Sequence, residues 1–257
     1  MQSRTLVTGG NGLVGRVLRR GLEGLAVTFP DRSQLEVSDP IALRRALAGH
    51  EQVIHLASPR RRPGWTQEDL DATLRMTSDV LDAAAEAGVK RVILPSSVLA
   101  TSIAQLRGGS KAGVVDSQPP DTEYGRSRLR IEQLGRKASE TGLEVACIRL
   151  GAVRHPDAPS HRPELQAQWL SHEDCAALFR ACLAASVVPG RFSLFYAVSD
   201  LPERVLDTAN PFGWTPRTKR VGFRRRALAA LHRVNTGIRG RLQIRTRLKS
   251  ILLRLRG

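Results

Sequence analysis

A tyrosine and an arginine lie four residues apart in the segment Tyr124-Gly-Arg-Ser-Arg128, and a serine pair, Ser96-Ser97, ends an apolar strand pattern upstream. On a helix this spacing places Tyr124 and Arg128 on one face. A cation one turn away stabilises a phenolate by Coulomb attraction, which suits Tyr124 to acid/base work in hydride transfer. With Ser97 polarising the substrate oxygen, these three are the candidate catalytic residues. The alternative is an ordinary amphipathic helix start with a half-buried tyrosine.

Three glycines follow the first apolar strand, in Thr8-Gly-Gly-Asn-Gly-Leu-Val-Gly15, where a helical pattern begins. Glycine permits a tight turn, a close approach of the backbone to a ligand, and close packing of helix on sheet. The amides at the helix start can then face a pyrophosphate. This context predicts a dinucleotide site whose contacts are Gly9, Gly12, Leu13, Val14 and Gly15. A plain strand-to-helix turn is the alternative, but it would not need all three glycines.

Asp31 and Arg32 follow the second strand and decide between two dinucleotides. A carboxylate there accepts hydrogen bonds from the adenosine ribose and repels a 2′-phosphate, whereas an arginine holds that phosphate. The carboxylate at the end of the second strand favours NAD as the cofactor, and NADP stays open. Asp31 as a turn or N-cap residue is the structural alternative.

Strand patterns alternate with helical patterns through the first 216 residues. The expected strands are Leu6–Val7, Leu25–Phe29, Gln52–Leu56, Arg91–Leu94, Val145–Leu150 and Phe192–Val198. The expected helices are Leu13–Leu22, Ile41–Ala48, Asp71–Ala87, a helix from Thr122 to Gly142, and His172–Ala185, with a loop over about 100–120. This alternation predicts an α/β, Rossmann-type doubly wound parallel sheet. Ligands bind beyond the carboxyl ends of such strands, where Asp31, Ser58 and Ser97 fall.

Other reactive side chains have a structural alternative. Arg149 ends a strand, and the triplet Arg60–Arg62 follows another, so each can recognise an anionic group. An ion pair for Arg149 and a solvated surface for the triplet are the alternatives. His55 lies inside a strand and reads as a core residue. The three cysteines lack metal-ligand spacing, and we expect no metal site.

The net charge of +16 resides almost entirely in the C-terminal segment. No Asp or Glu occurs from Thr208 onward, while 14 Lys and Arg lie between Arg217 and Arg256. We therefore expect a nearly neutral domain and a basic amphipathic helical tail over 217–257. The tail can pack on this protein or a dimer mate, lie on an anionic membrane, or contact an acidic partner or nucleic acid.

The chain contains no run of about 20 apolar residues that could span a bilayer, and its start lacks a signal-peptide core. These features predict a cytoplasmic protein, with the tail as a route to peripheral membrane association.

Together these motifs resemble the extended short-chain dehydrogenase/reductases of the NAD-dependent epimerase/dehydratase type. The resemblance rests on Thr8–Gly15, Val53-Ile-His-Leu-Ala57, Val80–Ala84, Ser96-Ser97 and Tyr124–Ser127, and covers roughly residues 3–216. Ile148–Gly151, Trp169–Asp174 and Tyr196–Ser199 are similar to uronate dehydrogenase-like members. The resemblance implies NAD as cofactor, with further contacts from Asp31, Arg32, Glu36, Val37, Leu56, Ala57, Ser58, Tyr124 and Arg128. It implies a substrate site at Ser58, Ser97, Val98, Arg149 and Arg162.

Several positions depart from the family pattern. Arg128 stands where the family has the lysine that binds the nicotinamide ribose and relays protons. Val98-Leu99 replaces the Asn-His of the uronate enzymes, Thr73 replaces a helix asparagine, and Glu164 replaces an arginine although Arg162 is near. These changes argue against uronate dehydrogenase itself.

The sequence therefore predicts one domain over 1–216, with a small substrate-covering region from about 151–170 and 187–216, and the tail beyond it. The favoured function is an NAD(P)-dependent oxidoreductase acting on a sugar-like or other hydroxylated small molecule. Epimerase or dehydratase chemistry on a nucleotide sugar is one alternative. A non-catalytic dinucleotide-binding regulator or scaffold with a basic effector tail is the other.

Overall fold

The computed structural model describes residues 3–59, 65–107, 111–202 and 204–218. Six parallel strands form one sheet in the order β2-β1-β3-β4-β5-β6. The strands are β1 (Thr5–Thr8), β2 (Val27–Thr28), β3 (Gln52–His55), β4 (Arg91–Ser97), β5 (Glu144–Leu150) and β6 (Phe192–Ala197). The strand order reverses at β1, between β2 and β3, and this switch point is where ligands bind in open parallel sheets.

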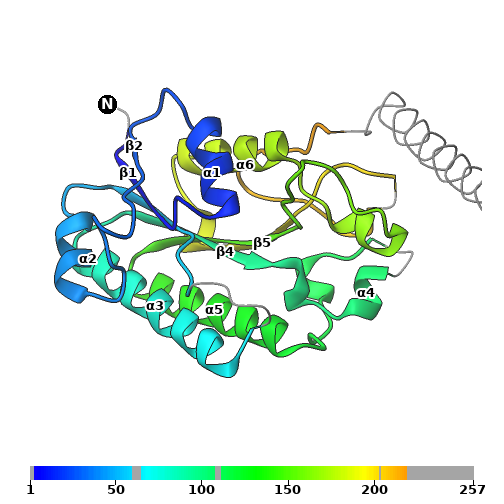
Figure 1. Ribbon diagram of the computed structural model, residues 1–257, viewed down its shortest axis with the longest axis horizontal. Helices are drawn as coiled ribbons and strands as arrows, with labels where there is room; N and C mark the ends of the chain where they lie inside the picture. The colour runs from blue at the N-terminus through cyan, green and yellow to red at the C-terminus, as the bar shows by residue number, and fades with distance from the viewer. Residues whose placement is uncertain (1–2, 60–64, 108–110, 203, 219–257) are drawn as a thin grey trace, which may run out of the picture. The chain divides into compact units, whose positions relative to one another are not determined.

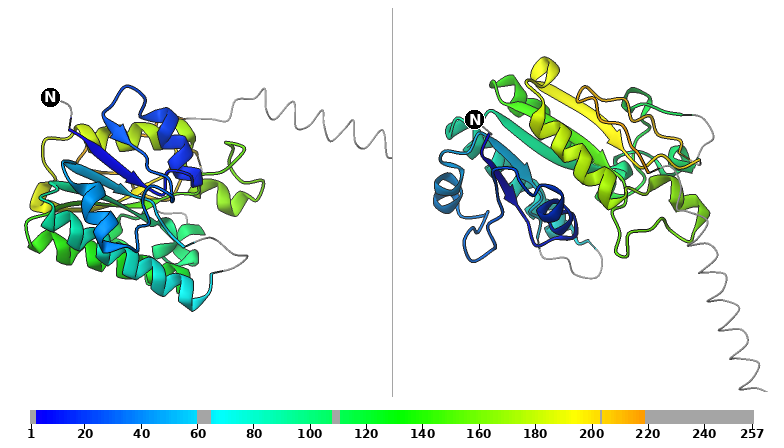
Figure 2. Two further views of the ribbon diagram at one scale, coloured as in Figure 1. Left: turned by 60° about the vertical axis from the view of Figure 1, so that its left-hand side comes forward. Right: turned by 90° about the horizontal axis from the view of Figure 1, so that it is seen from above.

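Helices cover both faces of the sheet. They are α1 (Leu13–Gly21), α2 (Pro40–Leu47), α3 (Gln67–Glu86), α4 (Ile103–Arg107), α5 (Glu123–Glu140) and α6 (His172–Ala184). Figure 1 shows α2, α3 and α5 along one face, and α1 and α6 along the other. Figure 2 shows the sheet from above, with the blue first strand toward one edge and the yellow last strand at the other. The expected doubly wound Rossmann-type fold is confirmed.

The period-two alternation of the strands fills two separate cores. Leu6, Val53 and Val92 pack with α2, α3 and α5, whereas their chain neighbours Val7, Ile54 and Ile93 pack with α1 and α6. Because both faces of a parallel sheet are buried, these strands read as continuous apolar runs.

Capping side chains start the long helices at defined residues. The Thr66 hydroxyl accepts the Asp69 amide in a capping box at the start of α3. The Thr122 hydroxyl accepts the Gly125 amide at the start of α5. Such caps satisfy amides that have no partner inside the helix, and they fix where α5 begins.

The expected loop over 100–120 holds local structure that the sequence did not reveal. It contains α4 and two short 3-10 helices, Val98–Ala100 and Val114–Asp116. Val98 and Leu106 form a third core with Tyr196, Val198 and Leu206. This segment therefore joins the expected covering region, whereas residues 192–197 of that region belong to the sheet as β6.

The body ends slightly later than expected. The buried Asp174 carboxylate accepts the backbone amides of Arg217, at 2.7 Å, and Thr218, at 3.3 Å. The unit that holds the sheet extends to Lys219, three residues past the expected boundary. The basic tail beyond it lies outside the described residues. Within the described part of the chain, no helix has the length and apolar character needed to cross a bilayer.

Candidate functional site

A cavity of about 720 Å³ opens at the carboxyl edge of the sheet. Its wall is built from the segments that follow β1, β3, β4 and β5, together with the first turns of α5. The sequence-predicted residues in the wall are Gly9, Gly12, Leu13, Val14, Gly15, Leu56, Ala57, Ser58, Ser97, Val98, Tyr124 and Arg128. The fold thus brings the glycine loop and the candidate catalytic residues to one cavity.

Another hollow, of about 790 Å³, lies at the opposite edge of the sheet. Four of its five charged lining residues pair with one another, Lys90 with Glu51 and Arg91 with Glu144, and the fifth, Arg191, donates to the Gly142 carbonyl. Because the strand carboxyl ends and the candidate catalytic residues face the first cavity, we assign the chemistry there.

The glycine loop packs against neighbouring backbone more closely than a side chain would allow. Gly9 has a φ of +71°, and a Cβ on it would lie 2.6 Å from the Ala57 backbone nitrogen. A Cβ on Gly15 would lie 2.6 Å from backbone atoms of Gly10. Gly12 supplies no side-chain cap to α1, so the amides at that helix start are left to an anion. This cradle fits a dinucleotide pyrophosphate.

Ser97 and Tyr124 enter the cavity from different elements. Ser97 is the last residue of β4, and its Oγ accepts the Leu99 amide at 3.1 Å. That contact leaves the Ser97 hydroxyl hydrogen available to a bound molecule. Tyr124 is the second residue of α5 and is half-buried, with its ring centroid 5.3 Å from the ring of Trp65.

Arg128 is buried beside two aromatic rings. Arg128 is 8% exposed. Its Cζ lies 4.6 Å from the Tyr124 ring centroid and 5.7 Å from the Trp65 ring centroid. Its Nε is buried and has no hydrogen-bond partner among the described residues. A buried donor without a partner is costly, so this one suggests an acceptor on a bound molecule.

His55 lines the same cavity but is held neutral. Its Nδ1 lies 2.8 Å from Thr8 Oγ1. Burial, followed by the charge of Arg128, lowers the pKa of His55 to about 4. The folded protein therefore keeps this imidazole uncharged at neutral pH, which leaves Tyr124 as the acid/base candidate.

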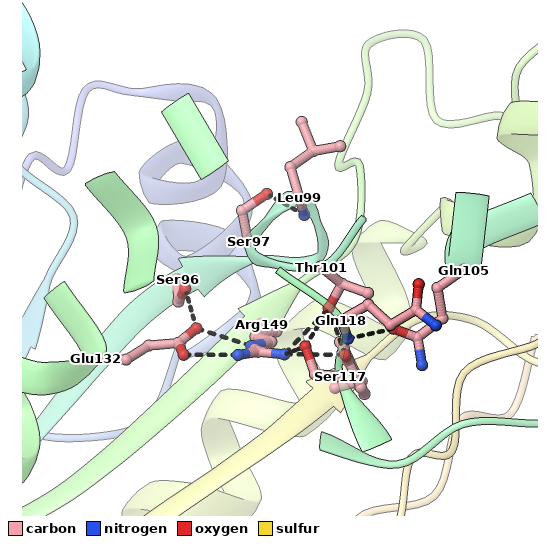
Figure 3. A network of polar contacts seen from close by, with 10 residues as sticks. Ser96, Ser97, Leu99, Thr101, Gln105, Ser117, Gln118, Glu132 and Arg149 are labelled. Carbon is pink, nitrogen blue, oxygen red and sulfur yellow. Dashed lines mark hydrogen bonds and ion pairs between the residues drawn. The ribbon is translucent and has the colours of Figure 1, made fainter. Parts of the chain in front are cut away.

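Arg149 lies in a buried polar network (Figure 3). Its Nε and Nη2 donate to the two carboxylate oxygens of Glu132, each at 2.8 Å. Its Nη1 donates to the hydroxyls of Thr101, Ser117 and Tyr196 at 2.7–3.0 Å. Arg149 is 3% exposed, lies outside the cavity wall and forms the ion pair expected as its structural alternative. Its substrate contact stays a prediction.

The network connects the elements that carry the candidate catalytic residues with the segment over 98–118. Glu132 lies one turn after Arg128 on α5 and also accepts the Ser96 hydroxyl at the end of β4. Thr101 and Ser117 belong to the segment over 98–118. The network therefore ties the strand that carries Ser97, the helix that carries Tyr124, and this segment to one another.

The residues expected around the adenosine lie outside the cavity wall. Asp31 is exposed, and its Oδ1 accepts the amides of Ser33 and Gln34, which realises the turn-forming alternative. These bonds, led by that of the Ser33 hydroxyl, lower the pKa of Asp31. Arg32 pairs with Glu36 at 2.6 Å. The ribose contact stays a prediction.

Two further expected contacts lie outside the cavity wall. Val37 is 5% exposed and packs in the core with α2 and α3, and its cofactor contact stays a prediction. Arg162 is exposed and does not line the cavity. Val37 shares this core with Leu35 and with Leu43 of α2. The Arg60–Arg62 triplet lies outside the described residues.

Sequence reasoning missed several wall residues. They are His55, Trp65, Thr73, Thr77, Leu94, Pro95, Ser96, Leu99, Thr122, Ile131, Leu150, Gly151, Ala152, Val153 and Gln168. Most lie in the last residues of β3, β4 and β5 or just after them, so the rule that located Ser58 and Ser97 could have found those. Trp65 carried no such signal, since it directly precedes the cap of α3 and does not lie at a strand end.

The cysteines take no part in this site. All three are buried, and burial raises the pKa of Cys175 and of Cys182 to about 12. A thiol in this state is a poor nucleophile and a poor metal ligand.

Comparisons with known proteins agree with this geometry. The model of the NAD dependent epimerase/dehydratase family matches residues 5–173. The chain is 30% identical over 246 residues to an L-arabinose 1-dehydrogenase (NAD(P)(+)) of Haloferax volcanii, covering 84% of this chain and 96% of the relative. It is 26% identical to a uronate dehydrogenase of Agrobacterium fabrum, covering 86% and 87%.

A solved structure shows the same fold. The crystal structure of uronate dehydrogenase from Agrobacterium tumefaciens superimposes with a TM-score of 0.73 at 25% identity, covering 87% of this chain and 88% of that chain. The family match, the relatives and the cradle at the strand ends lead to one conclusion. This chain belongs to the NAD dependent epimerase/dehydratase family.

Proposed function

We propose that this protein is an NAD(P)-dependent dehydrogenase that transfers a hydride between its cofactor and a sugar-like or other hydroxylated small molecule. One observation carries this proposal. The titratable side chains in the described cavity wall are His55, Tyr124 and Arg128. His55 is neutral and arginine keeps its proton, so Tyr124 beside the glycine cradle is the group left to exchange one.

The residues of this chain divide the work of substrate oxidation. Tyr124 Oη accepts the proton of the substrate hydroxyl, and Ser97 donates its free hydrogen to the same oxygen. The unpartnered Nε–H of Arg128 binds the cofactor ribose. The glycine cradle and the start of α1 hold the pyrophosphate. The nicotinamide, when bound, supplies the hydride chemistry.

The substrate is proposed to be an uncharged sugar. A sugar is supported by the relatives, whose names include an L-arabinose dehydrogenase and uronate dehydrogenases. Arg128 is the single cation in the described wall, and its proposed place is on the cofactor. A sugar acid would need a further cation for its carboxylate, and Arg149 and Arg162 lie outside the wall.

A panel of purified sugars tests this function. Full-length protein is mixed with NAD or NADP and with aldoses, uronates and simple alcohols, and reduced nicotinamide is followed by its absorbance. We expect turnover of at least one aldose, faster than of its uronate. Turnover of uronates alone would contradict the assignment of an uncharged sugar.

The two rival functions are less well supported. Dehydration needs another acid or base beside Tyr124, and the other candidate in the described wall, His55, has its pKa lowered to about 4 by burial. The regulator alternative rests on Arg128 and on Val98-Leu99, which replace family residues. If the cofactor binds but stays in one redox state with every substrate in the panel, the regulator is the better account.

Cofactor choice is proposed to depend on the negative charge of Asp31. Asp31→Ala should weaken NAD binding and shift the NAD-to-NADP affinity ratio about tenfold toward NADP, because repulsion of the 2′-phosphate disappears. Isothermal titration of both oxidised cofactors measures the ratio.

Asp31→Asn is the matched variant for this test. It keeps an oxygen for the Ser33 and Gln34 amides while removing the charge, so it should shift the ratio in the same direction. Ser33→Ala removes one turn hydrogen bond without changing the charge and should leave the ratio unchanged. An unchanged ratio in both Asp31 variants would refute the charge-based account.

The tail over 219–257 is proposed to be an accessory element that binds anionic surfaces, separate from the hydride chemistry. Truncation after Thr218 keeps the two amides that Asp174 accepts, so cofactor affinity and melting temperature should stay close to those of the full chain. Salt-sensitive association with anionic vesicles or nucleic acid should be lost, because screening and counterion release act on exposed charges.

Co-sedimentation at two salt concentrations, beside thermal melting, separates the outcomes for the tail. If the truncated protein melts far below the full chain and its binding is unchanged, the tail is instead a packing element of this protein or of a dimer. Localisation and a homodimer stay predictions.

A further inference from the structure

Trp65 closes one side of the cavity next to the proposed catalytic pair. Its ring centroid lies 5.3 Å from that of Tyr124 at an interplanar angle of 39°, and 5.7 Å from the guanidinium carbon of Arg128. The capping box of Thr66 and Asp69 directly after it fixes where α3 begins, and thereby the backbone at Trp65. Trp65 is half-buried and lines the cavity.

The contact with Trp65 stabilises Arg128 more than it would an arginine that already forms an ion pair. The residue is 8% exposed, and among the described residues no carboxylate forms an ion pair with it. A buried cation without such a partner is unfavourable. The faces of Tyr124 and Trp65 offset part of that cost, because an aromatic quadrupole attracts a cation most strongly where water is excluded.

Arginine suits this environment better than lysine. A planar guanidinium stacks on aromatic faces while its N–H groups stay free to donate, whereas an ammonium is compact and strongly hydrated. Arg128, which stands where the family has lysine, is therefore the residue that Trp65 contacts.

We propose that Trp65 is a positioning residue that holds the Arg128 guanidinium beside Tyr124 and leaves its Nε–H to the cofactor. The proposal rests on the function proposed above. It implies an energetic coupling between Trp65 and Arg128. Removal of the indole ring should matter while residue 128 is arginine, and far less once it is lysine.

A double-mutant cycle of Trp65→Ala and Arg128→Lys in the full chain tests this coupling. It is measured both as NADH affinity by calorimetry and as kcat and KM on the best sugar of the panel. Trp65→Ala alone should lower NADH affinity and kcat on the order of tenfold. In the Arg128→Lys background the same change should cost less than about threefold. Trp65→Phe keeps a ring face and should restore most of both values.

Several results would overturn the proposal. One is an equal effect of Trp65→Ala in both backgrounds, and another is Trp65→Phe as impaired as Trp65→Ala. A melting-temperature loss in Trp65→Ala that accounts for the whole loss of activity would also overturn it. Because NADH affinity is read separately, coupling in binding without turnover supports this role of Trp65 and rejects the proposed reaction. Turnover without coupling supports the proposed reaction and rejects this role of Trp65.

Discussion

Replacement of Tyr124 by phenylalanine is expected to lower kcat by at least ~100-fold, the low end of what a general acid/base contributes. The phenyl ring keeps the contacts with Trp65 and Arg128 and removes only the hydroxyl that exchanges the proton. NADH affinity should therefore change little. Steady-state kinetics on the best sugar of the panel, with calorimetry of NADH, measure both quantities.

The other tyrosine of the chain provides a matched control. Tyr196 is buried outside the cavity wall, and its hydroxyl lies 2.9 Å from Arg149 Nη1 in the buried polar network. Tyr196→Phe should lower the free energy of unfolding by about 1–3 kcal/mol and reduce kcat far less than Tyr124→Phe. Equal kcat losses in the two variants would remove the proposed acid/base role from Tyr124.

Replacement of Glu132 by leucine is expected to lower the free energy of unfolding by about 3–5 kcal/mol, because it leaves the buried charge of Arg149 without its partner. The side chains of the pair are 4% and 7% exposed, so water cannot replace the lost carboxylate. Denaturant titration with fluorescence detection measures the free energy. The loss is a large share of the total stability of a typical domain.

Two further variants show whether that loss comes from the uncompensated charge. Glu132→Leu together with Arg149→Met removes both charges and should recover much of the stability. Glu51→Ala breaks the exposed pair with Lys90 and should cost no more than about 1 kcal/mol. A loss below about 1 kcal/mol for Glu132→Leu would mean that the network does not stabilise the site.

The elements of this fold follow from local sequence signals. The apolar runs at Val53–Ile54 and Val92–Ile93 mark central strands because both faces of the sheet are covered. Glycines and hydroxyl caps mark where helices start and end. The glycine loop and the segment Tyr124–Arg128 have fixed places relative to these elements. For that reason their meeting at one cavity could be predicted.

The features that the sequence did not reveal are contacts between residues far apart in the chain. The carboxylate partner of Arg149 is on α5, 17 residues upstream, and its hydroxyl partners are Thr101, Ser117 and Tyr196. No local pattern states that these residues share a buried pocket. Val37 likewise depends on how α2 and α3 pack, and Trp65 on how α3 approaches α5. Tertiary packing decides each case.

Isotope transfer tests the central claim of hydride transfer most directly. The sugar with the highest turnover is prepared with deuterium at the carbon that carries the oxidised hydroxyl, and the cofactor is recovered and analysed by mass spectrometry. The account predicts that the deuterium moves from that carbon to the nicotinamide, and that Tyr124→Phe slows the transfer at least ~100-fold. Oxidised product with no deuterium in the nicotinamide, or bound cofactor that never acquires it from any sugar, would contradict the account.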